Sequence, residues 1–136
     1  YERSGPERFL SAFRVLVEFT RAAGAEPSAA EAAVIGRAAA HLMTMRRISI
    51  SVAGMLEAGK SPEVEAALLK ALGNDFEKML PEMVRLALSG RAMSDPTWAD
   101  FRQSYADTLL LSPSFTLRGG TREILRGVIA RGLGLR

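Results

Sequence analysis

The sequence predicts an all-α fold: an up-and-down four-helix bundle with one additional short helix. Apolar residues recur at spacings of three and four along most of the chain, whereas the alternation typical of strands is nearly absent. Gly, Pro and Ser interrupt this pattern at a few points, which predicts short connections. The chain has 136 residues, 48% of them hydrophobic, which suits one domain with its own core. Long helices with short connections pack best as antiparallel neighbours.

The first two helices are predicted at residues 6–23 and 29–58. Gly24 ends the first helix, and Ser28 followed by Glu31 three residues later is the pattern of a capping box at the start of the second. The spacing of the first helix predicts one apolar stripe, formed by Phe9, Leu10, Phe13, Leu16, Val17 and Thr20.

The remaining helices follow from similar signals. Gly59 is predicted to end the second helix, and Pro62 to open a third that ends near residue 89. Pro81 lies inside this third pattern and is expected to kink or split the helix. A shorter helix is predicted from Pro96 to about residue 111, then a loop over residues 115–120 and a last helix from Thr121.

Composition excludes several classes of function. The net charge is +3, but the Arg residues are dispersed among acidic neighbours, unlike the clustered stripe of a nucleic-acid-binding protein. With no Cys and His41 as the only His, a Cys- or His-based metal site is not expected. No apolar run is long enough to span a membrane. The lack of Cys and of a signal peptide is compatible with a cytoplasmic location.

The last third of the chain is the most specific part. Residues 114–126 read SFTLRGGTREILR, followed by Val128-Ile129-Ala130 and a Leu133-Gly134-Leu135 tail. This segment resembles the C-terminal end of acyl-CoA dehydrogenases, where a Gly-Thr turn leads into a helix of the form Thr-x-Glu/Gln-Ile-x-Arg-x-Ile-Ile-Ala. The resemblance covers about twenty residues closely and most of the chain loosely. It implies that residues 1–136 are a single C-terminal helical bundle domain of a larger flavoenzyme.

The resemblance also implies a cofactor, FAD. By position, Gly120, Thr121, Arg122 and Glu123 match the turn that contacts the flavin in that family. The residues themselves agree, because a glycine pair permits close backbone approach and the first turn of a helix offers free N–H groups. On spacing alone, the same residues also fit an ordinary loop with a Thr N-cap.

The reaction of the family, α,β-dehydrogenation of an acyl-CoA thioester, needs a carboxylate as general base. In many members this Glu directly precedes the Gly-Thr turn, but here that position is Gly119. Another branch takes the base from a Glu-Arg pair in the first helix of this domain, and Glu2-Arg3 resembles that pair. Glu7-Arg8 is a rival pair, and a Glu near a helix start is also favoured by the helix dipole alone.

The implied partners are an acyl-CoA substrate, an electron-transferring flavoprotein as electron acceptor, and other subunits of a homo- or hetero-oligomer that meet through the bundle. One departure bears on this assembly. Many members carry an Arg-Phe-Gly pattern between the first two helices, where they hold the flavin of a neighbouring subunit, but residues 24–28 read GAEPS. A non-catalytic subunit or assembly domain of a heteromeric acyl-CoA dehydrogenase is therefore the alternative function.

Overall fold

The computed structural model describes residues 10–91, 93–117 and 120–135. This part of the chain contains helices and turns and no strand, so the prediction of an all-α fold is confirmed. The elements in chain order are α1 (Leu10–Ala23), α2 (Ala29–Glu57), α3 (Glu63–Ala87), the 3-10 helix η2 (Pro96–Trp98), α4 (Ala99–Leu111), the 3-10 helix η3 (Ser112–Leu117) and α5 (Arg122–Gly132).

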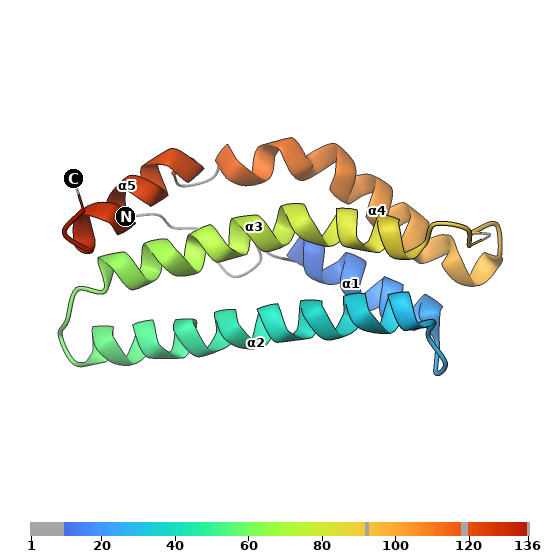
Figure 1. The fold of residues 1–136 in the computed structure, drawn as a ribbon, viewed down its shortest axis with the longest axis horizontal. Coiled ribbons are helices and arrows are strands. Elements are labelled where there is room, and N and C mark those ends of the chain that lie inside the picture. Colours follow the sequence, from blue (N-terminus) through green and yellow to red (C-terminus); the bar gives the residue numbers. More distant parts are fainter. Residues whose placement is uncertain (1–9, 92, 118–119, 136) are drawn as a thin grey trace.

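Helix α3 lies at the centre of the molecule. It has α2 along one side and α5 along the other, while α1 packs on α4 and on α3 (Figure 1). Helices α4 and α5 follow one another along the same side of α3, with η3 between them (Figure 1). As a result α2 forms one edge of the molecule, and among the α-helices it packs chiefly on α3 and to a lesser extent on α1.

The helix ends use the capping residues that the sequence predicts. Ser28 caps α2 by accepting a hydrogen bond from the Glu31 amide (3.3 Å), and the Glu31 carboxylate accepts one from the Ser28 amide (2.7 Å), which completes the capping box. Gly59 ends the turn after α2 with a φ of +71°, a conformation that glycine adopts without steric cost. Both predictions are confirmed.

The buried face of α1 differs from the predicted stripe. Phe13 is 45% exposed and Thr20 is exposed, whereas Phe19 is fully buried. The buried residues of α1 are Ala12, Val15, Leu16, Phe19 and Ala23. The helix turns this face inward because Ala12, Val15, Leu16 and Phe19 pack into the core cluster that α1 shares with its partner helices.

Two other segments differ from what the sequence predicts. Of the two outcomes expected at Pro81, the split does not occur: helix α3 continues through this residue, because Pro81 is buried among neighbouring helices whose packing outweighs the one missing backbone hydrogen bond. The segment expected to be a loop from Phe115 is part of η3, and the side chain of Phe115 is 1% exposed. The burial of Phe115 against the bundle explains why this segment forms a 3-10 helix rather than a loop.

An aromatic cluster joins α1 to α4 in the core. The ring of Phe19 lies 6.3 Å from that of Trp98 and 5.8 Å from that of Phe101, and Trp98 and Phe101 meet edge to face at 5.5 Å. Trp98 therefore packs in the core. His41 likewise packs locally, with its ring stacked 5.8 Å from that of Phe76.

Candidate functional site

The turn that precedes α5 is built by Gly120 and Thr121. Gly120 has a φ of +105°, a backbone conformation that residues with a side chain rarely adopt. Thr121 is the N-cap of α5, and its hydroxyl accepts a hydrogen bond from the amide of Ile124 at 3.5 Å. The Gly-Thr turn at a helix start that the sequence indicates is thus present in the structure.

Glu123 carries the negative charge closest to the start of α5. A backbone amide and the hydroxyl of Thr121 hydrogen-bond to its exposed carboxylate, and together they lower its pKa below the ordinary value. A carboxylate in the first turn of a helix interacts favourably with the helix dipole. The carboxylate of Glu123 therefore places a negative charge at the start of α5. This charge repels a phosphate but does not repel a neutral, electron-rich group.

Arg122 points toward α3 and pairs there with Asp75, and each side chain is about half exposed. The hydrogen bond that Arg122 donates to the Asp75 carboxylate also raises the pKa of Arg122. A cavity of about 30 Å³ lies between the two helices, lined by Ala71, Asn74, Asp75, Arg122, Leu125 and Arg126. This volume holds a water molecule at most. Sequence reasoning did not find Asp75, because the 47 residues that separate it from Arg122 leave no local pattern.

Glu2 and Arg3, the candidate general base and its neighbour, lie outside the described residues, and so do the rival pair Glu7-Arg8 and Gly119. The structure therefore describes the cofactor side of the candidate site, from Gly120 to Glu123, and not its catalytic side.

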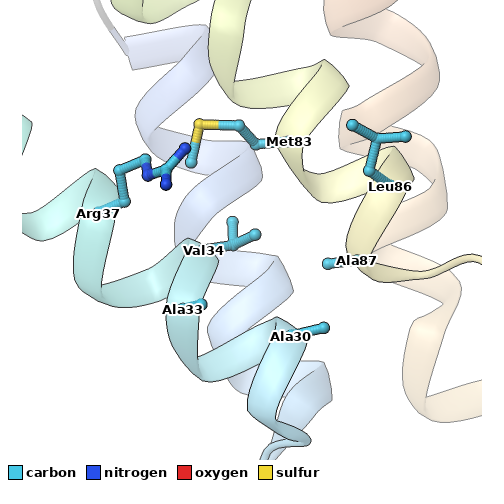
Figure 2. Close-up of a pocket in the computed structure, with 7 residues that line it drawn as sticks. All are labelled: Ala30, Ala33, Val34, Arg37, Met83, Leu86 and Ala87. Atoms are coloured by element: carbon cyan, nitrogen blue, oxygen red, sulfur yellow. The ribbon is translucent and has the colours of Figure 1, made fainter.

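A shallow groove runs between the start of α2 and the end of α3, with a volume of about 290 Å³ (Figure 2). Its walls are small or apolar, and its single charged residue is Arg37, whose guanidinium extends toward Met83 (Figure 2). The lining residues are Ala30, Ala33, Val34, Arg37, Met83, Leu86 and Ala87.

A larger groove of about 470 Å³ lies where the end of α2, the start of α3 and α5 meet. It is mostly apolar, with Glu63 as its one charged residue; the other lining residues are Val52, Leu56, Ser61, Pro62, Ala66 and Val128. Its volume is in the range of small-molecule sites. No motif in the sequence indicated this groove, because its residues come from three separate segments.

The buried face of α3 contains polar residues that sequence reasoning missed. Glu77 is fully buried and Asn74 is 4% exposed. Lys70 lies on the same side of the helix two turns before Glu77, and burial lowers its pKa. A signal was present, since Glu77 occupies an apolar stripe between Gly73 and Leu80, where a carboxylate is unusual.

Within residues 10–91, 93–117 and 120–135, no three His, Asp or Glu side chains are close enough to hold a metal ion. In the same part of the chain no helix combines the length and apolarity needed to cross a membrane.

Comparisons of this chain with protein-family models, with curated proteins and with solved structures find no match. The resemblance of residues 114–135 and the geometry of the turn before α5 are therefore the features of this chain that indicate a function.

Proposed function

We propose that the chain is the C-terminal helical domain of an FAD-dependent acyl-CoA dehydrogenase. One observation carries the proposal: the segment that resembles the family's flavin-contacting turn folds as a left-handed Gly120 followed by Thr121, which caps α5. A turn of this kind leaves backbone exposed at the start of a helix, where a ligand can approach closely.

The proposed architecture is an up-and-down bundle of α1 to α4, with α5 as the additional helix. The pairing of α2 with α3 and of α1 with α4 supports it, because these are adjacent pairs in such a bundle. The packing of α5 on α3 gives the fifth helix a fixed place beside that bundle.

The described residues fit the edge of a flavin better than a whole flavin. The cavity beside α5 holds about 30 Å³, far less than an isoalloxazine ring needs, and Glu123 disfavours a phosphate there. The neutral edge of the ring, placed against Gly120 and Thr121, would neither need a larger cavity nor be repelled by Glu123. Most of the flavin would then be held by other parts of a larger protein, and this domain alone would bind FAD weakly.

In the proposed reaction, Glu2 is the general base that removes the α-proton of the acyl-CoA thioester, with Arg3 beside it as a positive charge. Gly119 would leave space for the acyl chain or for the Glu2 carboxylate at the turn. FAD, when bound, supplies the acceptor for the β-hydride, and an electron-transferring flavoprotein would then receive the electrons.

The substitution Glu2→Gln in the flavin-loaded parent enzyme tests this role. The amide has nearly the shape of the carboxylate but accepts no proton, so turnover should fall by about 100-fold or more while bound flavin is retained. Glu7→Gln is the matched control, since it makes the same change at the rival pair and should leave turnover unchanged. Unchanged turnover in Glu2→Gln would show that Glu2 is not the base, and loss of turnover in Glu7→Gln alone would assign the base to Glu7.

The second candidate is a non-catalytic subunit or assembly domain of a heteromeric acyl-CoA dehydrogenase. Arg122 is held by Asp75, and the cavity beside the turn is not of ligand size, which favours this alternative. It predicts that the parent protein, purified with its partner subunit, retains full activity when Glu2 and Glu7 are both changed to Gln.

A further inference from the structure

The groove of about 470 Å³ lies between α2 and α5, with the start of α3 as its floor. Helices α2 and α5 pack on opposite sides of α3 rather than chiefly on each other, which leaves this space between them (Figure 1). We name it the α2–α5 groove. Its lining residues are Val52 and Leu56 of α2, Val128 of α5, and Ser61, Pro62, Glu63 and Ala66 at the start of α3.

The polar residues of the groove lie at its outer end, beside the turn that joins α2 to α3. Ser61 belongs to this turn and Glu63 is the first residue of α3, whereas Ala66 lies one helical turn further along. Helix α2 runs in the opposite direction, so Val52 lies one turn deeper in the groove than Leu56 (Figure 1). The side chain of Leu56 is 56% exposed and forms the apolar part of the rim.

Val128 lines the inner end of the groove. Helix α5 runs antiparallel to α3, and Gly132 near its end lies against Val64 near the start of α3. Val128 therefore lies about one helical turn deeper than this contact. It is half-buried, as is Val52 on the opposite wall. The inner end, formed by Val52, Ala66 and Val128, is thus wholly apolar.

Glu63 supplies the one charge of the groove. The residue is exposed, and within the described part of the chain no Lys, Arg or His side chain forms an ion pair with it. The end of α2 and the start of α3 both lie here, and their dipoles, each about half a charge and opposite in sign, offset one another. The full negative charge of Glu63 therefore makes the outer end attractive to a cation.

We propose that the α2–α5 groove binds a small primary amine with an apolar tail. The ammonium group lies at the outer end and donates hydrogen bonds to the Glu63 carboxylate and the Ser61 hydroxyl. The tail extends inward between Val52 and Val128 and is removed from water there. Because the two ends lie one helical turn apart, ~5 Å, a tail of about four to six carbon atoms spans the groove.

The size of the groove favours a small molecule over a protein. Its volume of about 470 Å³ is within the range of small-molecule sites. A protein partner would need about 20–30 contact residues on each side, far more than line this groove. The proposal does not rest on the flavin proposal, because no residue of the turn before α5 lines the groove.

Titration of this chain with hexylamine, followed by amide NMR, tests the proposal. The amine is protonated at pH 7, as the side chain of lysine is. We expect saturable shifts at Val52, Ala66 and Val128, with a dissociation constant of about 0.1–1 mM. Hexanol has the same tail without the charge and should bind about threefold to fivefold more weakly. Hexanoate should bind more weakly still, because Glu63 repels its carboxylate.

Three variants separate the contributions of charge and shape. Glu63→Gln should weaken hexylamine binding about threefold to fivefold and leave hexanol binding unchanged. Glu26→Gln is the matched control, since Glu26 is an exposed glutamate beside the other end of α2, and it should change neither. Ala66→Leu places a larger side chain in the groove and should weaken both ligands about tenfold or more.

Amide spectra recorded without ligand verify that each variant keeps its fold. A titration without saturable shifts at the inner end overturns the proposal. Hexanoate binding as tight as hexylamine binding would also overturn it, and so would equal weakening of hexylamine by Glu26→Gln and Glu63→Gln. Undiminished binding of hexylamine to Ala66→Leu would place the ligand outside the groove and would contradict the proposal as well.

Discussion

Arg91 closes over the buried carboxylate of Glu31. Its Nε lies 2.8 Å from Oε1 of Glu31, and its Nη2 donates a hydrogen bond to Oε2 at 2.9 Å. The two residues therefore form a bidentate ion pair, although 60 positions separate them in the sequence. The guanidinium also lies 5.2 Å from the ring centre of Trp98. One side chain thus joins the start of α2, the segment after α3 and the aromatic cluster.

Removal of Arg91 should destabilise the fold. Arg91→Ala leaves a fully buried carboxylate without its cation, which we expect to lower the free energy of unfolding by about 2–3 kcal/mol. Arg91→Lys keeps the charge but loses the second ion-pair contact with Glu31 and the contact with the Trp98 ring, so the decrease in stability should be smaller. Urea denaturation measures both. A change below about 0.5 kcal/mol in Arg91→Ala would contradict the assigned role.

The orientation of α1 can be tested with two phenylalanines. Phe19→Ala opens a cavity beside Trp98 and Phe101 and should cost about 3–5 kcal/mol. Phe13→Ala removes a ring of the same size that is 45% exposed, so it should cost far less, about 1 kcal/mol. Thermal or urea denaturation separates the two variants. The reverse order would show that α1 buries the stripe that the sequence predicted.

Gly132 of α5 lies directly against the side chain of Val64 in α3. A Cβ atom added at Gly132 would overlap the Cγ2 methyl group of Val64. Gly132→Ala should therefore destabilise the fold by about 1–3 kcal/mol, and adding Val64→Ala should recover part of that loss. Both effects are measurable by urea denaturation.

Gly127→Ala is the control for this contact. A Cβ atom there makes only an ordinary contact of 3.6 Å with Arg131, so the gain in helix propensity should stabilise the fold by about 0.5–1 kcal/mol. If Gly132→Ala stabilised the fold as Gly127→Ala does, the close approach of α5 to Val64 would be wrong.

Acid should weaken the fold through three exposed carboxylates. Hydrogen bonds from Arg85 lower the pKa of Glu82, and those from Thr97 lower the pKa of Asp95, while the pKa of Glu123 is lowered by a backbone amide and Thr121. A folded-state pKa below the unfolded one stabilises the fold above the unfolded values of 4.5 and 3.8 and loses that effect as pH falls through the folded values.

Urea midpoints measured between pH 7 and about pH 3 should therefore fall with pH. Asp95→Asn is the variant for this test, since it removes one of the three titrating groups. Its midpoint should depend less steeply on pH below pH 4 than that of the wild type. An equally steep decline in Asp95→Asn would show that Asp95 makes no contribution.

The sequence predicts those features that neighbouring residues determine together. Ser28 and Glu31 are three positions apart and identify the start of α2, and Thr121 identifies the start of α5 in the same way. The contacts of Glu31 with Arg91 and of Asp75 with Arg122 cross 60 and 47 residues and leave no local pattern. The face of α1 was missed because both Phe13 and Phe19 fit a helical stripe, and only the partner helices decide between them.

The order of the helices determines when each becomes able to pack during synthesis. Helices α2 and α3 are joined by residues 58–62 and can pair as soon as both have been made. Helix α1 is made first, yet its main partner α4 is made almost last. Before Trp98 and Phe101 have left the ribosome, Phe19 has neither ring to pack against. A nascent or truncated chain that ends at α3 would expose this aromatic face to chaperones or to aggregation.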